Sequence, residues 1–304
     1  MSEPSAPLAA LLWGAEPVAA LQRALGDAPL PALRLAGGLG GTWGIVLAAG
    51  LGLAWRGRRA AYGLLGAVAF ALPINMAIAF AAGVERPEGA GVRAHEHVDI
   101  PSFPSGHVVT ATVLSGYACA RYGLPAWAAA AFVALVGFAR LALGMHFVAD
   151  LPAGAALGAL LLAAYLRLWP RLERWLARRP RWFFSALAAC NVAGVLAAVA
   201  ALGPSPTAWQ SVGITAGASV GLLAEHRLVR YEPARAPGAP KLVALLAGAA
   251  PALAVASLAE QAVPPAASGA LAFALSLWLF AVGPALYPRL TARRRPAAGG
   301  ARAG

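Results

Sequence analysis

The chain has 304 residues, of which 60% are hydrophobic and 12% are charged, and its mean hydropathy is +0.68. A single core in water could not bury that much apolar surface, so the composition excludes a water-soluble globular domain and indicates a polytopic membrane protein. The formal net charge is +12, but the basic residues are distributed as a topology signal. No nucleic-acid partner is therefore expected.

The N-terminal residues lack the basic start and the continuous apolar stretch of a signal peptide. Residues 8–25 are amphipathic, and we expect residues 1–37 to form an outward-facing segment whose helix lies along the membrane interface. After this segment, apolar runs suitable for membrane spans of roughly 17 to 25 residues recur nine times. They lie near residues 38–55, 60–83, 105–120, 124–140, 146–166, 182–202, 208–224, 241–260 and 267–287. The predicted fold is all-α, a transmembrane helical bundle of about nine spans.

The basic residues divide unevenly between the two sides of this topology. When every second connection is placed on one side, 19 of the 24 Lys and Arg residues fall there, and the positive-inside rule makes that side cytoplasmic. The C-terminus is then cytoplasmic and the loop 84–104 faces outward. Apart from the segment 1–37, we expect a membrane core (38–181), a three-span module (182–288) and a basic tail (289–304). The strong preference for Arg over Lys, with abundant Ala and Gly, is typical of a GC-rich bacterial genome, so the expected location is the inner membrane.

Ionisable residues at the ends of membrane spans are energetically costly and therefore mark a candidate functional site. Such residues, with a Ser-Gly pair, gather at the outward ends of the second to fifth predicted spans. The cluster comprises Arg86, Ser105, Gly106, His107, Arg140, His146 and Asp150. Because these span ends share one side of the membrane, we expect the seven residues to meet near one leaflet surface.

The N-terminal part of this cluster and its arginines have chemistry that suits a phosphoryl group. Ser105 is a good helix N-cap and Gly106 permits close backbone approach, so the free N–H groups at this helix start form an anion site. Arg86 and Arg140 carry planar guanidinium groups that match phosphate oxygens bidentately. The sequence therefore predicts a site with several donors for one phosphate.

The remaining residues suit nucleophilic catalysis. His146 and Asp150 are four residues apart and are expected to share a helix face, where the carboxylate would orient one imidazole nitrogen and leave the other free to attack. His107 is then the candidate acid for the leaving oxygen. Taken singly, each motif has a structural explanation. PSGH is compatible with a turn and a helix cap, an Arg at a span end with a membrane anchor, and Asp150 with a helix cap. Together and in this order they predict a phosphate site.

Three segments resemble the motifs of the type 2 phosphatidic acid phosphatase superfamily, which usually read K-x6-RP, PSGH and SR-x5-H-x3-D. The segments are ERP (85–87), PSGH (104–107) and ARLALGMHFVAD (139–150). The resemblance covers about residues 38–168, and the last three spans are similar to those of longer bacterial members. It implies a metal-independent route through a phosphohistidine. By motif match, His146 is the nucleophile, Asp150 its orienting partner and His107 the general acid, while Arg86, Arg140, Ser105 and the backbone of Gly106 hold the phosphoryl oxygens.

Two positions depart from the family pattern. Ala139 stands where the family has Ser, and Ala79 stands where it has the first-motif Lys. Losing one preorganised cation typically costs ~3 kcal/mol, or about 10²- to 10³-fold in rate. A slowed enzyme is compatible with this loss, and Arg93, His95 or His97 of the outward loop are candidate replacements for the cation.

The expected function is an integral-membrane phosphatase that removes phosphate from a lipid phosphate or pyrophosphate at the outer leaflet, with its active site facing the periplasm or exterior. Two alternatives stay open. One is a lipid phosphotransferase, in which an alcohol accepts the phosphoryl group from His146. The other is a degenerate, non-catalytic phospholipid-binding member, for which Ala79 is the best evidence. The histidines of HEH (95–97) are more often solvated than metal-bound, so neither a metal nor a cofactor is expected.

Overall fold

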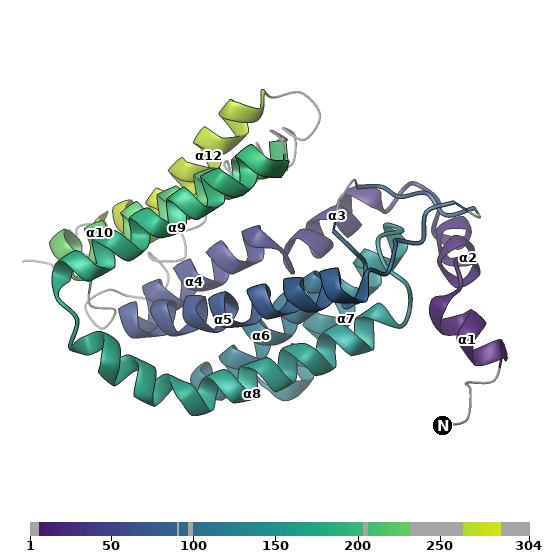
Figure 1. Cartoon of the computed structure of the whole chain (residues 1–304), viewed down its shortest axis with the longest axis horizontal. Coiled ribbons are helices and arrows are strands. Elements are labelled where there is room, and N and C mark those ends of the chain that lie inside the picture. The colour runs from purple at the N-terminus through teal and green to yellow at the C-terminus, as the bar shows by residue number, and fades with distance from the viewer. Residues whose placement is uncertain (1–5, 90, 97–99, 203–205, 232–263, 287–304) are drawn as a thin grey trace, which may run out of the picture. The chain divides into compact units, whose positions relative to one another are not determined.

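The computed structural model describes residues 6–89, 91–96, 100–202, 206–231 and 264–286. Every named element in these ranges is a helix, and an isolated bridge between Gly89 and Val92 is their only β contact (Figure 1). The all-α prediction is confirmed. The chain divides into two compact units: unit 1 comprises Met1–Ala48 and Tyr62–Ala177, and unit 2 comprises Ala49–Ala61 and Arg178–Gly304. The segment boundaries expected from the sequence stay predictions.

Three short helices open unit 1, where the sequence predicts one amphipathic helix over residues 8–25. They are α1 (Ala6–Trp13), α2 (Glu16–Leu25) and α3 (Leu30–Gly38). The predicted helix is divided because Pro17 occupies the first turn of α2, and proline has no N–H group with which to continue a helix that arrives from α1. Both α2 and α3 contact α7, so the N-terminal segment packs onto the bundle.

The longer helices of unit 1 form the bundle itself. They are α6 (Gly106–Tyr122), α7 (Ala126–Ala142), α8 (Asp150–Ala177) and most of α5 (Arg58–Ala82), while α4 (Thr42–Arg56) contributes its first half. Helix α6 packs against both α7 and α8. Small residues let α8 approach closely, since a Cβ atom added at Gly154 would lie 2.8 Å from the carbonyl oxygen of Ser105. This packing brings the start of α8 against the start of α6.

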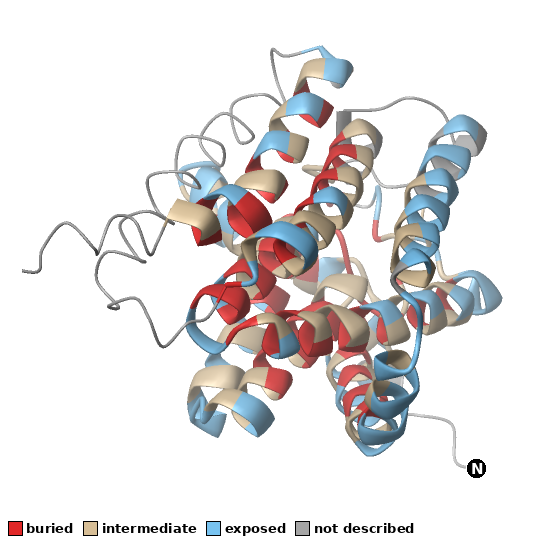
Figure 2. Ribbon diagram, turned by 90° about the vertical axis from the view of Figure 1, so that its left-hand side faces the viewer, coloured by how far each residue is buried: buried red, intermediate tan, exposed pale blue. Residues whose placement is uncertain are grey.

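The outward faces of these helices are apolar, as expected for contact with lipid. Figure 2 distinguishes the buried and exposed positions of the helices, and the exposed set includes Phe80 and Leu160, which are 59% and 67% exposed. Large apolar side chains in such exposed positions are unfavourable in water. Together with the composition, they support an integral membrane protein.

Only some of the nine predicted spans are long and apolar enough to count as spans in the structure. Three described helical segments qualify, Arg58–Ala82, Asp150–Ala177 and Ala266–Leu286, and the bent pair of α3 and α4 adds a fourth if it is one span. Helices also lie at most of the other predicted positions, whereas the span predicted at 241–260 lies outside the described residues. The structure therefore supports three or four membrane-capable helices, and the count of nine is not confirmed.

Unit 2 contains the helices that follow the bundle. They are α9 (Arg181–Leu202), α10 (Pro206–Ala224), the π-helical turn η1 (Glu225–Val229), α12 (Pro265–Leu277) and a second π-helical turn η3 (Trp278–Val282). Helix α10 packs along α12. A Cβ atom added at Gly213 or Gly217 would collide with the backbone of Gly269 or Phe273, so these glycines allow the close packing of α10 against α12.

Candidate active site

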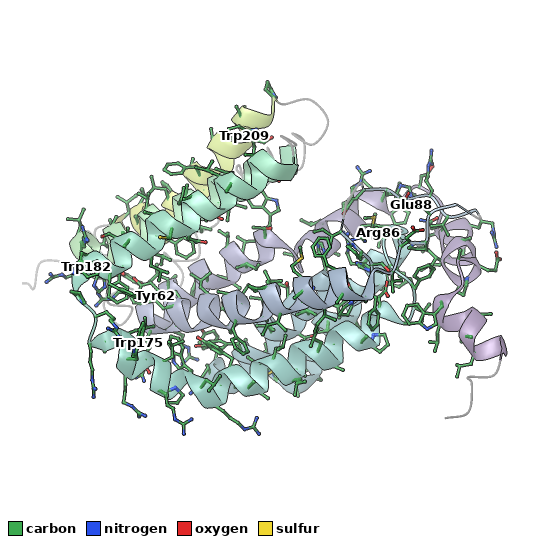
Figure 3. The ribbon with its side chains drawn as sticks, in the orientation of Figure 1. Tyr62, Arg86, Glu88, Trp175, Trp182 and Trp209 are labelled. Carbon is green, nitrogen blue, oxygen red and sulfur yellow. The ribbon has the colours of Figure 1, made fainter. Side chains whose placement is uncertain are left out.

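The candidate residues lie at one end of unit 1, on the connections α5–α6 and α7–α8 and the adjoining helix ends. Helices α1 to α3 lie at the same end (Figure 1). Figure 3 shows Arg86 and Glu88 at this end, with Tyr62 and Trp175 at the opposite end. Helix α8 begins at Asp150 and has 28 residues, which corresponds to about 42 Å at 1.5 Å per residue. The basic residues near its C-terminus therefore lie far from the candidate site.

The His146–Asp150 pair forms as predicted, but not on a shared helix face. His146 lies in the turn before α8, and Asp150 is the first residue of that helix. His146 Nδ1 is 3.1 Å from Asp150 Oδ2, and the same oxygen accepts a hydrogen bond of 2.9 Å from the backbone N–H of Phe147. The turn, not helical periodicity, thus brings the two side chains together. Because Nδ1 is engaged, Nε2 is the nitrogen left for chemistry.

The surroundings of His146 favour its neutral form. His146 is buried and lies in the α7–α8 connection, outside the spanning helices. Burial lowers the pKa of its imidazole, the hydrogen bond to Asp150 raises it, and the charges of Arg86 and Arg140 lower it further, with a net decrease. A neutral imidazole is the form that can act as a nucleophile.

Ser105 occupies the N-cap position of α6 without acting as a side-chain cap. Its backbone is extended and its N–H group donates to the carbonyl oxygen of Asp150 at 3.2 Å. The predicted N-cap position is confirmed, while the buried hydroxyl of Ser105 makes no cap hydrogen bond and has no partner among the described residues. The hydroxyl is instead available to a ligand at this helix start.

Asn75 is a neighbour of the site that was not among the predicted site residues. A Cβ atom added at Gly106 would lie 3.2 Å from Asn75 Nδ2, so the glycine allows this amide of α5 to approach the start of α6. Asn75 is buried, and its Oδ1 atom has no hydrogen-bond partner within the described ranges. Its signal in the sequence is a polar amide inside an apolar span.

The two predicted arginines are held differently. Arg140, at the end of α7, is only 1% exposed and its Nη1 atom lies 2.6 Å from Glu96 Oε2. Arg86 donates from Nε to the carbonyl oxygen of Ile100 at 3.0 Å and from Nη1 to that of Met145 at 2.6 Å. Arg86 therefore ties the α5–α6 connection to the residue before His146.

Arg86 remains a cationic partner for an anion. Burial lowers the pKa of Arg86 to about 10, with a further decrease from the charge of Arg140. At neutral pH Arg86 is still protonated, since its pKa lies well above 7. The close placement of two like charges is unfavourable by itself, so an anion between them would be stabilised.

His107 completes the cluster from the first turn of α6. Its imidazole is half-buried and experiences the charges of Arg140, His146 and Arg86. A Cβ atom added at Gly41, in the turn between α3 and α4, would lie 3.1 Å from His107 Nε2. The structure thus brings all seven predicted residues to one end of unit 1, with both imidazoles and both guanidiniums within electrostatic range of one another.

The structure does not identify a replacement for the missing first-motif cation among the described residues. Ala79 is buried on α5, one turn after Asn75. Arg93 is directed towards α2, with Nη1 3.8 Å from Asp27 Oδ1. His95 donates its backbone N–H to the carbonyl oxygen of Leu143, and partial burial and the charges of Arg93 and Arg34 lower the pKa of its imidazole. The third candidate, His97, lies outside the described residues.

Comparison with known proteins identifies the part of the chain that carries this cluster. Residues 60–174 match the model of the PAP2 superfamily, and all seven candidate residues lie within them. The crystal structure of the first transmembrane PAP2 type phosphatidylglycerolphosphate phosphatase from Bacillus subtilis is 21% identical, with a TM-score of 0.45, and the match covers 57% of this chain and 90% of that one. No match was found among curated proteins. Residues 60–174 of this chain are therefore similar to the PAP2 superfamily, and this segment carries the whole candidate site.

Proposed function

We propose that the protein is an integral-membrane phosphatase that hydrolyses a lipid phosphate or pyrophosphate at the outer leaflet through a phosphohistidine. The observation that carries the proposal is the hydrogen-bonded pair of His146 and Asp150 beside a second imidazole and two guanidiniums. A nucleophile, a candidate acid and phosphate-binding cations are the groups that phosphoryl transfer to and from a histidine requires.

In the first step, Nε2 of His146 attacks phosphorus and the bond from phosphorus to the lipid oxygen breaks. His107 gives its proton to that leaving oxygen. Asp150 accepts a hydrogen bond from Nδ1–H of His146, which stabilises the positive charge on the phosphorylated imidazole. Arg86, Arg140, the Ser105 hydroxyl and the N–H groups at the start of α6 hold the phosphoryl oxygens.

In the second step, the oxygen of a water molecule attacks the phosphorus atom of phosphorylated His146 and forms a new phosphorus–oxygen bond. His107, now neutral, takes a proton from the water, the phosphorus–nitrogen bond breaks, and neutral His146 is restored with release of inorganic phosphate. His107 is now protonated again and can act as the acid in the next cycle. Each group has therefore returned to its starting protonation state.

The orientation of unit 1 supports a lipid substrate at the outer leaflet. Asp150 and the basic residues Arg171 and Arg174 lie at opposite ends of α8, and the positive-inside rule assigns the basic end to the cytoplasm. In this topology, with nine spans and a cytoplasmic C-terminus in a bacterial inner membrane, the site lies near the outer headgroups. A phosphate headgroup would enter it while the lipid chain stays in the bilayer.

A non-catalytic phospholipid-binding protein is a second candidate, favoured by one observation. Ala79 occupies the position of the first-motif Lys and is buried, so the described site has one cation fewer than the family pattern. Against this candidate, a site that only binds phosphate has no use for the oriented His146–Asp150 pair.

The test is phosphate release by the purified full chain in liposomes that contain, one at a time, phosphatidate, phosphatidylglycerol phosphate, undecaprenyl pyrophosphate or a sphingoid phosphate. His146→Ala should abolish release without changing the melting temperature, and a base-stable phosphohistidine should be found at residue 146 of the wild-type protein by mass spectrometry. Undiminished release by the variant would refute the mechanism. Lipid binding without turnover would favour the non-catalytic candidate, and a phosphorylated lipid acceptor without free phosphate would indicate phosphotransfer.

A further inference from the structure

Arg140 already holds an anion of the protein itself. Its Nη1 atom lies 2.6 Å from Oε2 of Glu96, which belongs to the α5–α6 connection 44 residues earlier in the chain. The Arg140 side chain is 2% exposed and that of Glu96 is 30% exposed. A buried cation at the candidate site is therefore neutralised by a carboxylate that remains partly accessible to solvent.

The carboxylate of Glu96 engages only some of the hydrogen-bond donors at the candidate site. Nε of Arg140 and Oγ of Ser105 are buried and have no hydrogen-bond partner in the part of the chain that the structure describes. Carboxylate and phosphate oxygens bind a guanidinium with the same geometry, and each unfilled buried donor carries a desolvation cost. A phosphoryl group has more oxygens than one carboxylate and would satisfy more of these donors.

The side chain of Arg140 has packing contacts besides its ion pair with Glu96. Its side chain is buried at the end of α7, and a Cβ atom added at Gly37 of α3 would lie 3.4 Å from Arg140 Cδ and 3.6 Å from Nη1. Packing by α3 thus holds the side chain of this arginine. The contact with Glu96 is better explained as occupation of an anion position than as support for the guanidinium.

The formal charges at the site determine how easily an incoming anion can displace Glu96 from Arg140. The described site contains two guanidiniums, of Arg86 and Arg140, and two carboxylates, of Asp150 and Glu96. Their formal charges cancel, because Ala79 stands in place of a further cation. An incoming anion must compete with Glu96 for Arg140, and a dianion competes better than a monoanion because its Coulomb attraction to the guanidinium is larger.

We propose that Glu96 is a specificity-determining residue of the phosphoryl site. It occupies the anion position on Arg140 and yields this position to the terminal phosphoryl group of a monoester or pyrophosphate, which carries close to two negative charges at neutral pH. The monoanionic phosphodiesters of ordinary phospholipids displace it poorly and are therefore excluded. This inference rests on the proposed function, which assigns Arg140 to phosphoryl binding.

The test is calorimetric titration of the purified full chain in detergent with two probes, inorganic phosphate at neutral pH and dimethyl phosphate. In Glu96→Gln, which preserves the size of the side chain, phosphate should bind at least about tenfold more tightly. Dimethyl phosphate must displace the same carboxylate, so it should gain by a similar factor and reach measurable binding in the variant. The melting temperature reports whether the variant is folded.

Glu88→Gln is the matched control. Glu88 is exposed on the same connection and acts on Arg86 through space, so this variant removes the same charge while the Glu96–Arg140 contact remains. Equal gains in Glu88→Gln would show a general charge effect and overturn the proposal. Unchanged or weaker phosphate binding in Glu96→Gln would also overturn it, because Glu96 would then support Arg140 or be irrelevant to it.

The binding readout separates this inference from the proposed function. If no lipid phosphate is hydrolysed but Glu96→Gln still binds both probes more tightly than wild type, catalysis fails and the role of Glu96 stands. If wild-type protein releases phosphate and Glu96→Gln binds both probes only as tightly as wild type, the role of Glu96 fails and the phosphatase stands.

Discussion

The two units of this protein bury polar side chains in different ways. In unit 1, groups with complementary chemistry converge on one end from several elements. They are Asn75, Ser105, Arg140, His146 and Asp150, from α5, α6, α7 and the start of α8 with the turn before it. A carboxylate, an imidazole and a guanidinium within reach of one another are the components of a reactive site.

In unit 2, the buried carboxylate of Glu225 has a structural role. Its Oε1 atom accepts a hydrogen bond of 2.8 Å from the backbone N–H of Tyr231, and it lies 3.7 Å from Nε of Arg58. These contacts close the end of η1 and pair the charge. The comparison teaches that a buried ionisable residue in a membrane protein marks a candidate site only when other reactive groups meet it.

The largest expected effect is from Asp150→Asn. The amide keeps the size of the side chain but cannot stabilise a positive charge on His146, so phosphate release should fall by about 10²- to 10⁴-fold. Measurement of kcat and of the melting temperature on one preparation checks this. A fall in activity that merely follows loss of folded protein would make Asp150 a structural residue like Glu225.

Arg140→Lys should have the next largest effect. Lysine keeps the positive charge but loses the planar fork, so kcat/KM for a lipid phosphate should fall by about 10²-fold. The matched variant is Arg58→Lys in unit 2, at the guanidinium that accompanies Glu225. Equal losses of activity in both variants would break the distinction between the two units.

Trp13→Ala tests whether the N-terminal segment contributes to the site. The Trp13 ring lies 5.4 Å from that of Phe103 and 6.2 Å from that of Phe147, measured between centroids, and the Leu12 carbonyl accepts the N–H of Ala149. These contacts hold the loop of His146, and aromatic pairs contribute about 0.5–1.5 kcal/mol each. We expect kcat to fall by about two- to tenfold. Trp127→Ala, at a residue that is 75% exposed, is the control and should leave kcat unchanged.

Glu225→Gln should have the smallest effect on activity and a measurable effect on stability. This variant makes the same acid-to-amide change as Asp150→Asn, but at the buried carboxylate of unit 2. Because Glu225 has a structural role, phosphate release should stay within about twofold of wild type. Weakening the charge-assisted bond should lower the free energy of unfolding by about 1–3 kcal/mol. The melting temperature measures this, and a large loss of kcat without destabilisation would assign unit 2 a part in catalysis.

Local patterns were sufficient for the class of fold and for the seven candidate residues. The all-helical membrane bundle follows from apolar runs, and the cluster follows from the position of polar residues at span ends. The His146–Asp150 contact was predicted from helical spacing, although a turn forms it. Spacing of four residues limits the separation of two side chains in either conformation, so the contact survived the wrong local geometry.

Other features could not be predicted because they depend on contacts between distant segments. The backbone N–H of Ser105 donates to the carbonyl oxygen of Asp150, 45 residues later, and the Ser105 hydroxyl has no partner among the described residues. Asn75 reaches the start of α6 because Gly106 leaves room for it. Nor did any pattern along the chain indicate that α1 and α3 would pack onto the loop of His146 and onto Arg140.

By itself, the sequence determined that this chain is an α-helical membrane protein and which side chains could form a phosphate site, because hydropathy and residue chemistry are properties of the chain at each position. Only the tertiary structure decided which anion Arg140 holds and which nitrogen of His146 is left free. These depend on the paths of the two connections and on the packing of α3 against α7, which place residues such as Glu96 and Arg140 together across 44 positions of the chain.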